Sequence, residues 1–133
     1  MGAWEITNFG NDTAMDWISD FEEDPTVPLL LQTMQAVFED EYLDSDIASE
    51  ALAAIEVVAA AKGKPSSDFP EEIEAGQLAA VAAAIDTKLI ETCKKTITRI
   101  IKEQDNELFE LWQEAGEGQD WVNIQKDLLS RVS

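Results

Sequence analysis

The sequence predicts an all-α fold: a single compact domain of six or seven short helices, with a short N-terminal arm packed on the core. Apolar residues recur at intervals of three and four along most of the chain, which is the spacing of one face of an α-helix. No stretch of four or more residues alternates between apolar and polar as a half-buried strand does. The length of 133 residues fits one helical domain spanning residues 1–133.

The first two predicted helices are separated by prolines. Asn11 or Asp12 can cap the first helix, because short polar side chains accept hydrogen bonds from its free N–H groups. Pro25 and Pro28 stop that helix and open the next, since proline fits a first turn but not a helix interior. The two apolar faces expected to point to the core are Ala14, Trp17, Ile18 and Phe21 on the first helix, and Leu30, Met34, Val37 and Phe38 on the second.

The third predicted helix begins at a cap formed by Asp44 or Ser45 and ends at Gly63. Its sequence from Ala51 to Ala61 is apolar on most sides and is interrupted only by Glu56. A helix that is apolar on most sides has neighbours on most sides. We therefore expect this helix to lie at the centre of the domain.

The second half of the chain contains a loop over 63–70 and four further helices. We expect them from Pro70 to about Ile85, from about Asp86 to Glu103, from a cap at Asp105 or Asn106 to a break at Gly116 and Gly118, and from a cap at Asp120 to the end of the chain. Cys93 falls on the apolar side of its helix, which favours a buried and unreactive thiol.

Composition excludes several classes of function. The chain has no histidine, which removes Ser–His and Cys–His nucleophile pairs and nearly all zinc sites. The formal net charge is −19, and residues 1–61 contain fourteen acidic residues and no basic one. Such a surface repels nucleic acids and anionic lipids and attracts cationic partners. With one cysteine and no long apolar run, we expect a cytoplasmic protein without a cofactor, and no partner among nucleic acids or membranes.

Aromatic and polar residues alternate near the N-terminus. In one interpretation, an extended arm tucks Trp4 and Phe9 onto the helical core, and Asn11 or Asp12 caps the first helix. In the other, Trp4 and Trp17 are the walls of a binding pocket, and Asn11 and Asp12 supply its polar groups.

Glu56 stands out because a buried carboxylate is destabilising unless it is paired or hydrogen-bonded. One hypothesis is that Glu56 accepts a hydrogen bond from the Trp4 indole or from the backbone of the N-terminal arm and so locks the arm down. The alternative is that Glu56 reaches solvent at the edge of its helix.

Acidic residues form a candidate binding surface on the first two helices. Asp12, Asp16 and Asp20 recur every four residues and therefore share one helix face. We predict an N-terminal acidic face made of Asp12, Asp16, Asp20, Glu23, Asp40 and Glu41. A solvated surface, such as a halophilic protein carries, is the alternative. A basic stripe (Lys88, Lys95, Arg99 and Lys102) is expected to pack beside the acidic helices.

Two pairs of acids have the spacing used by all-α, Mg²⁺-dependent nucleotide pyrophosphohydrolases. These are Glu41 with Asp44 and Glu71 with Glu74, each separated by two residues. An enzyme built on carboxylates and Mg²⁺ or Mn²⁺ is therefore the alternative function.

Motifs at both ends of the chain and in its middle point to a known family. The N-terminus reads Met1-Gly2-Ala3-Trp4 and then Phe9, Asn11-Asp12, Ala14 and Asp16-Trp17; the C-terminal part reads Asn106-Glu107-Leu108, then Leu111-Trp112. The middle helix is rich in alanine and holds one Glu. These motifs resemble a bacterial family of unknown function, domain-of-unknown-function family 4259. Glu5 departs from it, standing where the family has a second Gly. The resemblance implies the helical fold and no activity.

The sequence thus favours a small acidic interaction module that binds a cationic protein through the N-terminal acidic face, for example as an immunity-type inhibitor of a basic toxin. It favours a non-enzymatic role and assigns no catalytic or metal-binding residue.

Overall fold

A computed structural model describes residues 5–133 of the protein, so the predictions for Trp4 lie outside the described residues. Within that range the chain forms seven α-helices and one 3-10 helix, and the prediction of an all-α fold is confirmed. The elements are α1 (Asp12–Glu23), α2 (Val27–Gln35), η1 (Ala36–Phe38), α3 (Ser45–Ala61), α4 (Ala75–Ala84), α5 (Thr87–Ile100), α6 (Glu107–Glu114) and α7 (Gly118–Val132).

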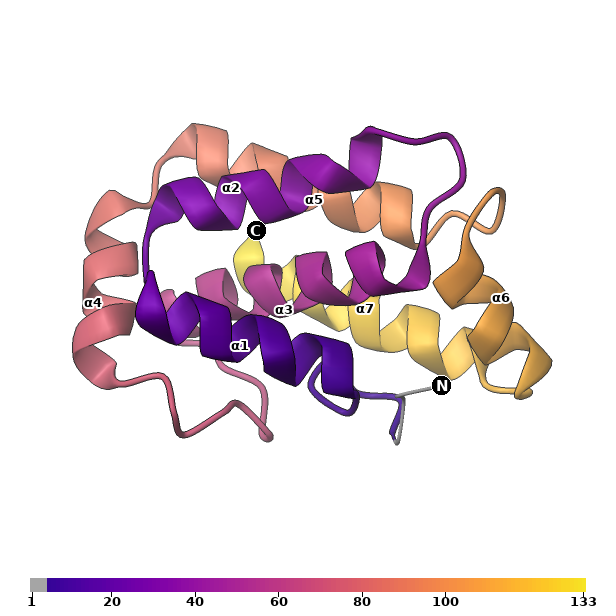
Figure 1. Ribbon diagram of the computed structural model, residues 1–133, viewed down its shortest axis with the longest axis horizontal. Coiled ribbons are helices and arrows are strands. Elements are labelled where there is room, and N and C mark those ends of the chain that lie inside the picture. Colours follow the sequence, from indigo (N-terminus) through magenta and orange to yellow (C-terminus); the bar gives the residue numbers. More distant parts are fainter. Residues whose placement is uncertain (1–4) are drawn as a thin grey trace.

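Helix α3 lies at the centre, as its apolar sequence predicted. Every residue from Ala51 to Ala60 is buried, Glu56 included. The helix packs against all six other α-helices and against η1, with α4 at one end of the bundle and α6 at the other (Figure 1). Its many alanines allow this, because small side chains let neighbouring helices approach closely on all sides.

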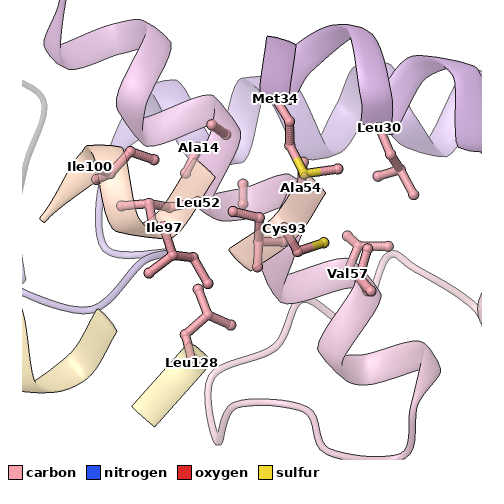
Figure 2. Packing of buried hydrophobic residues seen from close by; sticks show 14 of the residues in the cluster. Ala14, Leu30, Met34, Leu52, Ala54, Val57, Cys93, Ile97, Ile100 and Leu128 are labelled. Carbon is pink, nitrogen blue, oxygen red and sulfur yellow. The ribbon is translucent and has the colours of Figure 1, made fainter. Parts of the chain in front are cut away.

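The hydrophobic core surrounds α3. Leu52, Ala54 and Val57 from α3 meet Leu30 and Met34 from α2 and Cys93, Ile97 and Ile100 from α5, with Ala14 and Leu128 contributed by α1 and α7 (Figure 2). Complete burial of a leucine or isoleucine contributes roughly 1.5–3 kcal/mol to folding. Burial also raises the pKa of the Cys93 thiol to about 12, which keeps it in the unreactive thiol form.

Polar caps define where most helices begin. Of the two predicted candidates for α1, Asn11 is the cap, and its side chain accepts a hydrogen bond from the Ala14 N–H at 2.8 Å. Asp44 caps α3 and Asn106 caps α6 in the same way. Gly63 follows α3 with a φ of 85°, a backbone conformation that favours glycine and ends the helix.

Three predicted boundaries were wrong by several residues. Helix α4 begins at Ala75 and not at Pro70, because Ile73 is buried in the preceding turn and Gln77 accepts a hydrogen bond from the Glu74 N–H. Helix α5 ends at Ile100 and not at Glu103. Helix α7 begins at Gly118, so Asp120 lies in its first turn and does not cap it.

Phe38 was predicted to face the core, and this was wrong. The second helix tightens into η1 at Ala36, and this change of helical period turns Val37 inward and Phe38 outward. The Phe38 side chain is 52% exposed, whereas Val37 is buried.

Among residues 5–133, none of the helices combines the length and apolarity needed to span a bilayer.

Candidate functional site

The N-terminal arm, residues 5–10, is held against the helices. Phe9 is buried and its ring packs edge-on against Phe69, with 5.6 Å between the ring centroids. The arm closes on itself through a hydrogen bond from the Glu5 N–H to the Gly10 carbonyl at 3.1 Å. A β-carbon at residue 10 would lie only 2.9 Å from the Glu5 carbonyl oxygen, so the close turn requires glycine there.

Glu56 lies beneath this arm and is only 2% exposed. Its carboxylate accepts a hydrogen bond from the Asn8 side-chain amide at 2.8 Å. Arg131 of α7 donates two more, at 2.8 and 3.1 Å, in the bidentate arrangement that matches a guanidinium to a carboxylate. Glu56 therefore contacts the arm through the Asn8 side chain and does not reach solvent. Trp4, one of the expected donors, lies outside the described residues.

Asn8 also joins the arm to α7. Its amide pairs reciprocally with the buried amide of Gln125, with N–O distances of 2.9 and 2.7 Å. Asn8, Glu56, Gln125 and Arg131 form what we call the polar cluster. These four side chains hold three distant parts of the chain together.

Arg131 completes the polar cluster at its outer edge. The guanidinium donates to Asp127 at 2.8 Å and to the Lys64 carbonyl at 3.1 Å. Burial alone would lower the pKa of Arg131, but its hydrogen bonds and attraction to Glu56 and Asp127 raise that pKa above its ordinary value. The guanidinium is therefore charged at neutral pH.

A groove of about 440 Å³ opens over the polar cluster, between the arm, the loop after α3 and α7. Glu56 and Arg131 both line this groove and form an ion pair with each other. Glu56 is therefore not free to act as a general base. The arrangement suits a structural lock for the arm.

Trp17, Asn11 and Asp12 do not form the predicted pocket. Trp17 is buried and its indole N–H donates to the Thr33 hydroxyl at 2.9 Å. Asn11 borders a separate cavity of about 50 Å³, which Trp17 does not line, and Asp12 is exposed. Thr7 lines both this cavity and the groove over the polar cluster, and its buried hydroxyl has no hydrogen-bond partner within residues 5–133.

The α1 part of the predicted acidic face is exposed: Asp12, Asp16, Asp20 and Glu23 all reach solvent. It continues onto the start of α3, where Thr13 of α1 donates to the Asp46 carboxylate at 3.0 Å. Glu50 lies half-buried on α3, one turn further along. Its burial, followed by repulsion from Asp46, Asp20 and Asp44, raises the pKa of the Glu50 carboxyl.

We name Asp20, Asp44, Asp46 and Glu50 the α1–α3 acidic cluster. Within the described part of the chain, none of the four takes part in an ion pair. The cluster therefore concentrates negative charge that the protein itself does not neutralise.

Asp40 and Glu41, the other two members of the predicted face, lie in the exposed loop between η1 and α3. The Glu41 carbonyl accepts a hydrogen bond from Arg99 of α5 at 3.1 Å. Helix α5, which carries the basic stripe, packs against α2, η1, α3 and α7. Of the two acidic helices expected beside the stripe, α2 is therefore a main neighbour of α5, whereas α1 is not among its main neighbours.

The two acid pairs with the spacing of a metal enzyme, Glu41 with Asp44 and Glu71 with Glu74, each include a residue at a helix cap. Asp44 caps α3, and Glu74 occupies the cap position of α4. Within residues 5–133, no three or more acidic or cysteine side chains are grouped so as to hold a metal ion.

Several residues of the site were missed at the sequence level. Gln125 stands on the apolar side of α7, four residues after Trp121 and three before Leu128, and that position could have identified it as buried. Arg131 lies a further six residues along the same helix. Asn8 sits in an irregular segment where periodicity gives no signal.

The sequence model of the family described as "Domain of unknown function (DUF4259)" matches residues 2–123, and the chain belongs to this family. Neither the curated proteins nor the solved structures contain a match to the chain.

Proposed function

We propose that this protein is a small acidic interaction module that binds a cationic protein partner through the α1–α3 acidic cluster and the exposed acids of α1. The observation that carries the proposal is Glu50, a half-buried carboxyl whose pKa is raised by burial and by three neighbouring aspartates. An acid in such surroundings is destabilising when it is ionised. A lysine or arginine of a partner would remove that repulsion on binding.

The surrounding charge supports the same partner class. Residues 1–61 hold fourteen acids and no basic residue, so a cationic protein experiences long-range attraction toward this half of the chain. Electrostatic complementarity of this kind raises association rates and selects partners by charge. An inhibitor of a basic toxin or nuclease is one concrete form of such a module.

Some of these acids can be substituted to test binding without disturbing the fold. The acids chosen for neutralisation are Asp20 and Glu50 of the cluster and Asp16, one turn before Asp20 on α1, because none of the three caps a helix. Asp44 is left unchanged because its side chain caps α3.

The test is affinity capture from extracts of the producing cells at about 50 mM salt, where surface charges are weakly screened. The baits are the wild type, a cluster variant (Asp16→Asn, Asp20→Asn, Glu50→Gln) and a control variant (Glu71→Gln, Glu72→Gln, Glu114→Gln). Both variants lose three negative charges, so they differ only in position.

We expect one basic protein to bind the wild type and the control variant, to be released by a salt step, and to be lost from the cluster variant. Equal loss from both variants would mean that binding follows net charge alone. Retention by the cluster variant would contradict the proposal.

A further inference from the structure

Phe38 is an exposed aromatic that lines a basic groove and directly precedes an acidic loop in the sequence. Within residues 5–133, the large hydrophobic side chains exposed to solvent are Phe38 and Tyr42, at 52% and 47%. Tyr42 already has a partner, because its hydroxyl donates to Glu110 at 2.8 Å. That bond is the largest influence raising the pKa of Tyr42 to about 12. Within the described residues, Phe38 takes part in none of the aromatic ring pairs.

One strip is basic. Phe38 borders a groove of about 560 Å³ whose other lining residues come from α5 and its C-terminal end: Lys94, Lys95, Thr98, Arg99 and Lys102. The basic strip, defined as Lys94, Lys95, Arg99 and Lys102, contains four of the nine basic residues of a chain with 28 acids. This groove is therefore a local exception on an acidic surface.

The other strip is the acidic loop, defined as Glu39, Asp40 and Glu41, which directly follows Phe38 and is exposed. The two strips do not neutralise each other. Within the described residues, the single ion pair of the basic strip joins Lys94 to Glu91 at 3.8 Å, and none reaches the acidic loop. Arg99 is held by backbone carbonyls, among them those of Glu41 and Asp105 at 3.1 and 2.8 Å.

We propose that a second copy of this chain docks on the Phe38 surface about a two-fold axis. The acidic loop of each copy then faces the basic strip of the other, and Phe38 lies between the strips near the axis. A two-fold contact requires a surface that complements itself, and every ion pair in it forms twice. A surface that carries an exposed aromatic, a basic strip and an acidic loop offers both of the charges that such a contact pairs.

Other occupants fit the surface less well. A polyanion or an acidic peptide attracted by the basic strip would be repelled by the acidic loop beside it. A cationic peptide attracted by the acidic loop would be repelled by the basic strip. A second copy offers each strip its complement. The net charge of −19 on each copy opposes association in general, so the proposed contact depends on the pairing of each basic strip with the acidic loop of the other copy.

This inference does not rest on the proposed function. It assigns Asp40 and Glu41 to contact between copies, while the α1–α3 acidic cluster remains available to a cationic partner.

The test is the molar mass in solution, measured by light scattering and sedimentation at about 150 mM salt. A loop variant carries Glu39→Lys, Asp40→Lys and Glu41→Lys. A strip variant carries Lys94→Glu, Lys95→Glu and Lys102→Glu. Matched controls carry the same changes of charge elsewhere: Glu71→Lys, Glu72→Lys and Glu114→Lys, or Lys64→Glu, Lys88→Glu and Lys126→Glu. Circular dichroism verifies that each variant is folded.

We expect the wild type and both controls to be dimers, and each charge-reversed variant alone to dissociate with at least a tenfold higher Kd. An equimolar mixture of the loop and strip variants should restore a dimer, because one copy then presents two positive strips and the other two negative strips. Phe38→Ser should weaken the dimer by a similar factor. A monomeric wild type, or variants that remain dimeric, would overturn the inference, and so would a mixture that does not associate.

Discussion

Glu50 and Glu56 lie six residues apart on α3 and are in opposite electrostatic situations. Glu56 is 2% exposed, and its carboxylate is matched by the Arg131 guanidinium and the Asn8 amide. Glu50 is less buried, yet its neighbours are three aspartates, and no cation is paired with it among the described residues. The comparison teaches that depth of burial does not decide whether an acid is stabilised in the folded protein. The presence of a compensating cation does.

The largest expected effect comes from removing that cation. Arg131→Ala leaves Glu56 buried with Asn8 as its remaining partner, and loss of one member of a buried pair is strongly destabilising. We expect the free energy of unfolding to fall by about 3 kcal/mol, and Tm to fall by roughly 10 °C. Urea and thermal unfolding measure both. The double variant Glu56→Leu/Arg131→Met should recover most of the loss, and single variants as stable as the wild type would refute the lock.

A smaller effect is expected at the other partner of Glu56. Asn8→Ala removes hydrogen bonds to Glu56 and Gln125 and should lower stability by about 1–2 kcal/mol. We expect the loss of stability to be confined to the N-terminal arm, because the helices are stabilised by their own hydrophobic core. Hydrogen exchange should show lost protection of the Gly10 N–H, which donates to the Thr7 carbonyl at 3.0 Å. Unchanged protection there would mean that Phe9 alone secures the arm.

The smallest effect on stability is expected from substituting Glu50, and this substitution should be stabilising. The folded protein raises the pKa of this carboxyl above its ordinary 4.5, so ionised Glu50 destabilises the fold at neutral pH. Glu50→Gln should therefore stabilise the protein at pH 7, by less than about 1 kcal/mol because solvent screens a half-exposed group. The gain should shrink as pH falls through the folded pKa and vanish below the unfolded value, where both forms are protonated. Thermal unfolding across that range measures it, with Glu71→Gln as the control.

Most of the fold was predictable because periodicity and capping are local signals. The apolar faces of α1 and α3 and the caps at Asn11, Asp44 and Asn106 follow from neighbouring residues. Phe38 was misplaced because a change from an α-helical to a 3-10 period moves a side chain to another face without altering the apolar pattern.

The candidate site was less predictable because its contacts are distant in sequence. Glu56 could be singled out as the one acid in an apolar helix. Its partners Asn8 and Arg131 lie 48 and 75 residues away, and no spacing rule connects them. The same holds for Glu50, whose repulsion by Asp20 arises only when α1 packs against α3.

The most direct test of the account is a titration of ¹⁵N-labelled protein with a lysine- and arginine-rich peptide at low salt, followed by NMR. The account predicts the largest chemical-shift changes in α1 and the first two turns of α3, around Asp20, Asp46 and Glu50, and their loss in the cluster variant. Changes spread evenly over all exposed acids, or centred on Glu71 and Glu72, would contradict it.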